Sequence, residues 1–381
     1  MSSENNSSQR PETVAIHGEK KGRTPAAGDP VVPPRVNSTI FRFSEDPQPG
    51  DLVYTRHQNP NRDQLERVLA SLEGGESCAA FSSGMAAASA IFQSLNPGDH
   101  LLLPLDLYHG VRTLANQVMG RWGLEVEAID MTDIALVKSS LRPETAMVWL
   151  ETPSNPLLQI TDIEAITEIC RKRNVDVVVD NTWPTPLGQQ PLGLGADLVL
   201  HSTSKYIGGH SDLLGGAVIG RDGERLDTIR QIQTTAGAVP SPDDCWLMLR
   251  SIRTLPLRMR GHHENAQRMA ILLDQDSRVE RVFYPGLANH PGHQIARKQM
   301  SAYGGMISFL VKGGREKASR VVQGSRLIAA ATSLGGVESL WEHRILSETP
   351  ESETPEHLIR FSVGLEHSED LMADIDHALN C

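Results

Sequence analysis

The sequence lacks the features of several large classes of protein. Its 381 residues include only 4 cysteines, none in CxxC spacing, which favours neither a disulfide framework nor a zinc site. No segment reaches the roughly 18 unbroken apolar residues that a membrane span requires. The polar N-terminus has no apolar stretch of the kind found in secretory signals. We therefore expect a reduced, cytoplasmic protein with no metal site and no membrane segment.

An excess of positive charge is also missing. The formal net charge is −11, and the acidic residues are spread along the chain rather than gathered in a tail. This balance argues against nucleic acid and anionic membranes as partners. Hydrophobic residues make up 39% of the chain, enough for a substantial core, and the length favours more than one domain.

Changes in residue pattern predict three regions. Residues 1–50 are rich in Ser, Pro, Gly and Asn, which predicts an extended N-terminal arm that contacts a neighbouring subunit. Residues 51–245 predict an α/β domain, because a helical pattern from Pro60 is followed by short apolar runs typical of a mostly parallel sheet covered by helices. These runs are 100–105, 146–150, 175–179, 198–200 and 216–219.

The third predicted region has a different residue pattern. Residues 246–381 combine a long helical pattern with two later strand-like runs, 306–311 and 358–363. We interpret this region as a smaller C-terminal α+β domain.

Lys205 follows one of the predicted strands and lies among small polar residues, in the segment Ser202-Thr-Ser-Lys-Tyr-Ile-Gly-Gly. Ligands of doubly wound sheets bind beyond the carboxyl ends of strands. A lysine whose amine is partly neutral can form a Schiff base there, and the hydroxyls of Ser202 and Ser204 are suited to a phosphate. The simpler alternative is a surface lysine in a Ser/Gly loop.

Three further features add weaker signals. Asp180 ends an apolar strand, where a buried carboxylate needs a partner such as a pyridinium nitrogen; a helix cap is the alternative. Gly84 and Met85 begin a predicted helix, whose free N–H groups bind phosphate, although such helix starts are common. Tyr108 follows another strand and is placed either to stack on a flat cofactor or simply to pack.

In chain order, these features and several other motifs resemble the Cys/Met-metabolism family of pyridoxal-phosphate enzymes, over nearly the whole chain. The resemblance implies fold type I, with pyridoxal 5'-phosphate as cofactor and a γ-substituted amino acid as substrate. The motifs are Glu12-Thr-Val-Ala-Ile-His17, Tyr54-Thr-Arg56, Ser82-Ser-Gly-Met85, Glu151-Thr-Pro-Ser-Asn155, Asp180-Asn-Thr182, 202–212, Leu255-Pro-Leu-Arg-Met259, Ser333-Leu-Gly-Gly-Val-Glu-Ser339 and Arg360-Phe-Ser-Val-Gly-Leu-Glu-His367.

The resemblance also implies a role for each matching residue. Lys205 forms the Schiff base and moves protons, assisted by Tyr108, which stacks on the cofactor ring, while Asp180 pairs with the ring nitrogen. The phosphate is bound by Gly84, Met85, Ser202 and Ser204.

Further implied roles concern the substrate and the assembly. Tyr54 and Arg56 reach the phosphate of a neighbouring subunit, which makes a dimer the minimum active unit and a dimer of dimers the expected assembly. Arg360 clamps the α-carboxylate of the substrate in the paired geometry that arginine favours, and Asn155 and Ser333 help to orient that substrate.

Two departures from the family pattern concern the substrate. Enzymes of the family that use cystathionine carry a Glu directly before the Ser-Leu-Gly-Gly motif and an Arg five residues past the stacking tyrosine. Here these positions are Thr332 and Thr113, and Arg112 is the alternative source of the second charge. Without both charges the distal groups of cystathionine lack partners. We therefore predict γ-elimination or γ-replacement on another substrate, such as a methionine-like, O-acylhomoserine or canavanine-like compound.

Several alternatives stay open. Within the family, the chain is alternatively a cystathionine γ-synthase or β-lyase. Outside it, the alternative is a binding protein that keeps the fold without catalysis. His109 either lines the pocket or does not, Trp341 is interpreted as core, and His343 and Arg344 are interpreted as a solvated surface.

Overall fold

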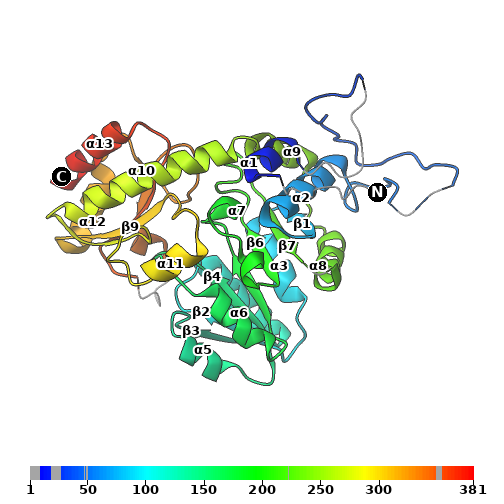
Figure 1. Cartoon of the computed structure of the whole chain (residues 1–381), viewed down its shortest axis with the longest axis horizontal. Helices are drawn as coiled ribbons and strands as arrows, with labels where there is room; N and C mark the ends of the chain where they lie inside the picture. The colour runs from blue at the N-terminus through cyan, green and yellow to red at the C-terminus, as the bar shows by residue number, and fades with distance from the viewer. Residues whose placement is uncertain (1–8, 19–26, 47, 49, 222, 349–353) are drawn as a thin grey trace, which may run out of the picture.

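The computed structural model describes residues 9–18, 27–46, 48, 50–221, 223–348 and 354–381. Within this part of the chain a seven-stranded sheet forms the core of the larger domain, in the order β1-β7-β6-β5-β4-β2-β3 (Figure 1). Strand β7 runs antiparallel to both neighbours, and the other pairings are parallel. The strands are β1 (Ser77–Phe81), β2 (His100–Pro104), β3 (Glu125–Ile129), β4 (Thr145–Glu151), β5 (Asp176–Asp180), β6 (Leu198–His201) and β7 (Gly216–Gly220).

The mostly parallel sheet predicted from the apolar runs is confirmed, and the five runs correspond to β2, β4, β5, β6 and β7. The two strands at the ends of the sheet, β1 and β3, were not predicted. The helices of this part are α2 (Pro60–Glu73), α3 (Gly84–Gln93), α4 (His109–Thr113), α5 (Ile134–Ser140), α6 (Ile163–Arg171), α7 (Thr185–Gly188), α8 (Gly223–Ala236) and α9 (Pro242–Ile252).

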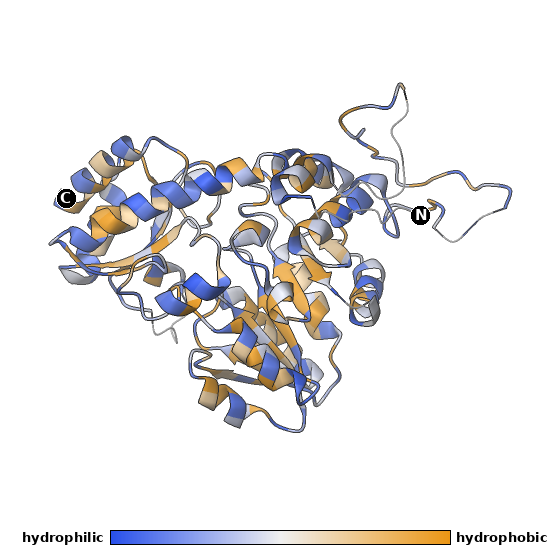
Figure 2. Ribbon diagram, in the orientation of Figure 1, coloured by the Kyte–Doolittle hydropathy of each residue, from blue (hydrophilic) through white to orange (hydrophobic). Residues whose placement is uncertain are grey.

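Helices cover both faces of this sheet because the buried strands are apolar on both sides. In β5, Val177 and Val179 pack in one cluster with residues of α5 and α6, whereas Val178 packs in another with residues of α3. Figure 2 shows the same arrangement, with hydrophobic strands at the centre and amphipathic helices around them. Each fully buried aliphatic side chain of this kind contributes about 1.5–3 kcal/mol to folding.

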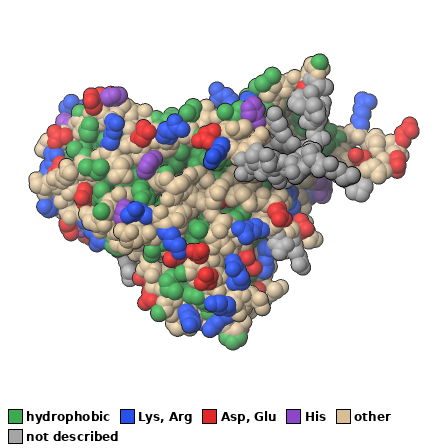
Figure 3. All heavy atoms as spheres, viewed as in Figure 1, with side chains coloured by type: hydrophobic (Ala, Val, Ile, Leu, Met, Phe, Trp, Pro, Cys, Tyr) green, Lys and Arg blue, Asp and Glu red, His purple; other side chains and the backbone are tan. Residues whose placement is uncertain are grey.

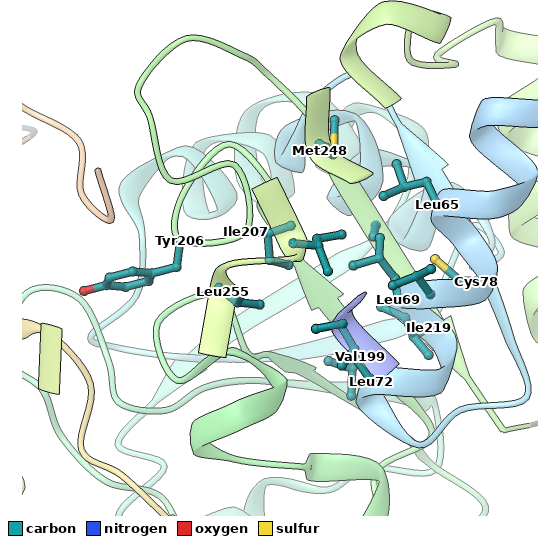
Figure 4. Close-up of a cluster of buried hydrophobic side chains, with 14 of the residues drawn as sticks. Leu65, Leu69, Leu72, Cys78, Val199, Tyr206, Ile207, Ile219, Met248 and Leu255 are labelled. Carbon is teal, nitrogen blue, oxygen red and sulfur yellow. The ribbon is translucent and has the colours of Figure 1, made fainter. Parts of the chain in front are cut away.

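Helix α2 closes the face of the sheet near β1 and β7 (Figure 4). Its side chains Leu65, Leu69 and Leu72 recur at helical spacing and belong to the same cluster as Val199 of β6 and Ile219 of β7. Asn59 caps the helix by accepting a hydrogen bond from the backbone N–H of Asn61 at 2.9 Å, and Gly74 ends it in the left-handed conformation.

The C-terminal part forms a smaller α+β unit. Its described residues build a five-stranded sheet in the order β10-β11-β12-β9-β8, antiparallel except for the β10–β11 pair. Trp341 is buried against Phe361, as interpreted from the sequence. The elements are α10 (Leu255–Gln275), β8 (Val279–Phe283), α11 (His293–Gln299), β9 (Met306–Val311), α12 (Gly314–Gly324), β10 (Ala329–Ala330), β11 (Leu340–His343), β12 (Leu358–Ser362) and α13 (Ser368–Asn380).

The boundary predicted between residues 245 and 246 falls inside α9, and the division into domains stays a prediction. Cys245, Met248 and Leu249 of this helix belong to the core cluster of the larger domain, together with Leu65 of α2. The change of element comes between α9 and α10, after Ile252.

The arm predicted for residues 1–50 is not extended throughout, because it contains α1 (Pro11–His17). Val14 and Ala15 of α1 are buried in the same cluster as Val68 of α2. Residues 27–46 carry no helix and expose Val31, Ile40 and Phe43, and they extend from the right of the molecule in Figure 1.

The surface seen in Figure 3 carries acidic and basic side chains interspersed over the same face. No helix in the described ranges is long and apolar enough to cross a bilayer.

Candidate active site

A cavity of about 520 Å³ lies where the carboxyl ends of the central strands face the C-terminal part of the chain. Asp180 and Glu151 come from the ends of β5 and β4, and Lys205 follows β6. Arg360 reaches the cavity from β12 of the smaller sheet. Most of the residues predicted for the site line this single cavity: Gly84, Met85, Tyr108, His109, Asn155, Asp180, Ser202, Ser204, Lys205, Thr332, Ser333 and Arg360.

Lys205 is half-buried and its Nζ donates to Oγ of Ser333 at 2.9 Å. Burial lowers the pKa of the Lys205 amine, and the positive charge of Arg360 lowers it further. Ser333 adopts a φ of 91°, an uncommon conformation for a residue with a side chain, which costs on the order of 1–3 kcal/mol and is typical of functional positions. The lysine is therefore held in place and has an increased neutral fraction, as an amine that reacts must.

Arg360 is held from three sides. Its Nη1 donates to Oδ1 of Asn155 at 3.0 Å, and its Nη2 donates to the backbone carbonyl of Ser333 at 3.3 Å. The same Nη2 lies 2.6 Å from Oε1 of Glu342, which faces Arg360 across the β11–β12 pair. Burial lowers the pKa of Arg360 to about 10, so the guanidinium stays charged at neutral pH.

The start of α3 forms one end of the cavity. Ser83 caps the helix by accepting a hydrogen bond from the backbone N–H of Ala86 at 3.0 Å. A Cβ at Gly84 would lie 2.8 Å from Cβ of Ser202, and one at Gly216 would lie 2.2 Å from the carbonyl oxygen of Ser83. Only glycines allow these backbones to approach so closely. The free N–H groups of a helix start therefore meet the Ser202 side chain, an arrangement suited to a phosphate.

Ser204 also lines the cavity, but its hydroxyl is already engaged. Its Oγ accepts from the backbone N–H of Gly215 at 2.9 Å and donates to the Gly215 carbonyl at 3.3 Å. Its assignment as a phosphate ligand stays a prediction.

Two carboxyl groups face each other deep in the cavity, Asp180 on β5 and Glu151 directly across on β4. Burial raises the pKa of both groups, and the charge of Asp180 raises that of Glu151 further. A buried carboxylate is stabilised by a cation, so a protonated ring nitrogen beside Asp180 would lower its pKa again. Asp180 also accepts from the backbone N–H of Thr182 at 3.0 Å, which fixes its orientation.

A buried hydrogen-bond network extends the site behind Asp180. His201, at the end of β6, lies with its Nε2 2.8 Å from Oε2 of Glu73, and Asn181 donates to Oε1 of the same carboxylate at 3.2 Å. The charge of His201 lowers the pKa of Asp180 in opposition to burial. This network was not predicted, because Glu73 lies in α2, far from the site in sequence.

Tyr108 stands at the mouth of the cavity. Its backbone N–H donates to Oε2 of Glu151 at 2.9 Å, and its ring lies 4.7 Å from the ring of His109, measured between centroids. A Cβ at Gly110 would lie 2.5 Å from the tyrosine ring, so the glycine leaves room for the ring. His109 lines the cavity, and burial lowers its pKa, which leaves it neutral at pH 7.

A helix start for a phosphate, a buried carboxylate for a cationic ring nitrogen and a lysine with a lowered pKa fit pyridoxal phosphate in one cavity. Nothing in the described ranges groups His, Cys, Asp or Glu side chains in a way that would hold a metal ion.

Four predicted residues are not among the described residues that line the cavity: Tyr54, Arg56, Arg112 and Thr113. Arg112 donates to the backbone carbonyl of Leu105 instead. Arg56 donates through Nη1 to the carbonyl of Thr234 at 2.6 Å, and Tyr54 is 38% exposed. The contact of Tyr54 and Arg56 with a neighbouring subunit stays a prediction.

The solvated surface predicted for His343 and Arg344 is wrong. His343 is 4% exposed and Arg344 only 1% exposed, and Arg344 lines the cavity. Arg344 is buried because two carboxylates pair with it: Nη1 lies 2.8 Å from Oε1 of Glu342, and Nε lies 2.6 Å from Oε1 of Glu348. Sequence reasoning missed Arg344, Glu342 and Glu151 as parts of the site.

The fold and this cavity define a pyridoxal-phosphate-dependent enzyme of fold type I. The chain belongs to the family described as Cys/Met metabolism PLP-dependent enzyme, whose model matches residues 12–380.

Proteins similar to this chain include a cystathionine gamma-synthase and a cystathionine gamma-lyase. The chain is 44% identical to a cystathionine gamma-synthase from Mycobacterium tuberculosis, with 97% of this chain and 96% of that protein covered. It is 40% identical to a cystathionine gamma-lyase from Bacillus subtilis, with 96% and 98% covered. The crystal structure of metB from Corynebacterium glutamicum matches with a TM-score of 0.94 and 43% identity, covering 98% of both chains.

Proposed function

We propose that this enzyme catalyses γ-elimination, or γ-replacement, on a γ-substituted α-amino acid other than cystathionine. A methionine-like thioether, an O-acylhomoserine and a canavanine-like compound are the candidates. The observation that carries the proposal is the wall of the cavity beside Arg360. Of the described residues that line the cavity, only Glu151 and Asp180 carry carboxyl groups, and both lie at the end that suits the cofactor.

A distal ammonium group such as that of cystathionine would need a carboxylate. Oε1 of Glu342 contacts both Arg344 and Arg360, and its Oε2 accepts from the hydroxyl of Ser347 at 3.2 Å. Thr332, at the position where cystathionine enzymes carry Glu, also hydrogen-bonds to Glu342. Because these contacts occupy Glu342, an ammonium group would be buried without an acceptor, which is costly.

The residues of the chain suit the proton transfers of this reaction. Pyridoxal phosphate, when bound, supplies the ring that accepts electrons from Cα of the substrate. Arg360 donates to the substrate α-carboxylate and so fixes which bonds at Cα face the cofactor. Lys205 is the base that removes the proton at Cα, because its lowered pKa leaves it partly neutral. The same amine, together with Tyr108, then removes the proton at Cβ and gives a proton to the departing γ-group.

A cystathionine γ-synthase or β-lyase is the second candidate, and the similarity to the Mycobacterium tuberculosis synthase favours it. A panel of γ-substituted amino acids tests both, with keto acid and added-thiol products measured and cystathionine as the reference. We expect at least one substrate to exceed cystathionine in kcat/KM by on the order of a hundredfold. Equal or better use of cystathionine, in cleavage or synthesis, would refute the proposal.

A variant of Thr332 sharpens this test. Thr332→Glu adds a carboxylate to the cavity wall and should raise cystathionine turnover relative to wild type. Thr332→Gln has nearly the same size without the charge and is the matched control. A similar gain in both variants would show that size, not charge, limits cystathionine.

A further inference from the structure

We propose that Arg344 determines specificity by donating a hydrogen bond from Nη2 to an acceptor oxygen on the γ-substituent of the substrate. The inference rests on the proposed function and narrows its substrate class to compounds with such an oxygen, such as the carbonyl of an O-acyl group.

The first support is an unpaired donor. Nε and Nη1 of Arg344 pair with Glu348 and Glu342, whereas Nη2 is buried without a hydrogen-bond partner among the residues the structure describes. Leaving a charged donor unpaired in a buried site is costly, and the side chain is only 1% exposed and lines the cavity. A substrate oxygen would satisfy this donor.

The second support is the position of Arg344 relative to Arg360. Both guanidinium groups contact the same oxygen, Oε1 of Glu342, so they are immediate neighbours in the cavity. A substrate with its α-carboxylate on Arg360 would therefore lie next to Arg344. Before a substrate binds, the two arginines and the two glutamates that pair with them cancel in charge.

The third support is the chemistry of the surrounding wall. Ser347, Thr332 and His109 line the cavity with Arg344, and Nδ1 of His109 is likewise buried without a partner among the described residues. The hydroxyls of Ser347 and Thr332 already donate to Glu342, so the unpaired donors of this wall, among the residues described, are on Arg344 and His109. Glu342 and Glu348 are not among the described lining residues. The wall thus favours an oxygen acceptor over a cation.

Unreactive ligands test this without turnover. Norleucine, lysine and the 6-amide of 2-aminoadipate share a six-carbon chain and end in a methyl, an ammonium and a carbonyl group. They carry a carbon–carbon bond where the γ-leaving group would be, so binding is measured independently of γ-elimination. Dissociation constants for the holoenzyme come from the change in cofactor absorbance or from calorimetry.

We expect the amide to bind wild type more tightly than norleucine, and lysine to bind most weakly. Arg344→Met should abolish the preference for the amide, a loss of about ten- to a hundredfold for a buried bond to a charged donor. Arg344→Lys keeps a charge for the two glutamates but lacks the planar second donor, so it should lose the same preference even if the methionine variant folds poorly. Arg281→Lys, an exposed arginine on β8, is the matched control.

Two results would overturn the inference. If Arg344→Lys weakens all three ligands equally, Arg344 serves the α-carboxylate or the fold rather than the γ-substituent. If lysine binds the wild-type enzyme more tightly than the amide does, Glu342 and Glu348 bind a cationic γ-substituent instead. Neither result depends on which substrate turns over, so a failure here is distinct from a failure in the substrate panel.

Discussion

Replacing Arg360 is the most direct test of how the substrate is held. Arg360 is 4% exposed, and Asn155 and Glu342 orient its guanidinium toward the cavity. Arg360→Ala would remove the two hydrogen bonds that we propose Arg360 donates to the α-carboxylate, and a bond to a charged group is worth about 1.5–3 kcal/mol. The two together are worth about 3–6 kcal/mol, a loss in kcat/KM of about two to four orders of magnitude.

Arg360→Lys separates charge from geometry. An ammonium keeps one contact but cannot make the planar pair, so it should recover only about half of the lost free energy. The assay is kcat/KM on at least three substrates with different γ-substituents, because all of them share the α-carboxylate. Arg281→Ala is the matched control, since Arg281 is exposed on β8.

The expected pattern is a similar loss for every substrate. A loss confined to one substrate would refute the reasoning and assign Arg360 to the distal end of the site. Melting curves of each variant are needed as well, because Arg360→Ala leaves Glu342 with Arg344 as its remaining arginine partner, and breaking a buried ion pair costs about 3–5 kcal/mol.

Three other predictions follow from the same structure. Borohydride reduction of the holoenzyme should attach the cofactor to Lys205, as read by peptide mass; label on another lysine, or none, would refute the assignment. Mixing Lys205→Ala chains with Arg56→Ala chains should restore part of the activity if Arg56 serves a neighbouring subunit; mixed dimers without recovery would contradict shared sites. Burial raises the pKa of the Asp106 carboxyl from 3.8 to about 6. Because the folded state binds the carboxyl proton more tightly than the unfolded state, folding stability falls as the pH rises from 3.8 to about 6. Asp106→Asn should therefore gain melting temperature over wild type at pH 8 but not at pH 4, and an equal effect at both would contradict this.

The central strands were predictable because their signal is local. In β4 and β5 continuous apolar runs predict burial on both faces. The end strands were not, because β1 reads Ser-Cys-Ala-Ala-Phe and β3 reads Glu-Val-Glu-Ala-Ile. The first has mostly small residues, and the polar/apolar alternation in the second is too short to stand out, so pairing with a neighbour decides their conformation.

The residues of the site also divide into those that the local sequence predicts and those that depend on long-range pairing. Lys205, Asp180 and Arg360 stand out in sequence because each is a reactive or charged residue beside an apolar run. Arg344 did not stand out, because the segment Glu342-His-Arg344 is typical of a polar surface. Only the pairing of β11 with β12 places Glu342 opposite Arg360. Long-range pairing turned an apparent surface segment into a wall of the cavity. The short helix α1 was missed because its burial depends on packing against α2.

The pairing of β1 with β7 constrains the order in which the sheet can be completed during synthesis. Strand β1 hydrogen-bonds within its sheet only to β7 among the described strands, pairing Ser77 with Gly220. A contact so distant in sequence closes a long loop, which is slow and entropically costly. The start of α3, which directly follows β1, is packed against Ser202 and Gly216, so the nascent chain cannot complete this end of the cavity until β7 has been synthesised. Arg360, on β12, is synthesised later still, so the residues at the two ends of the cavity become available one after the other.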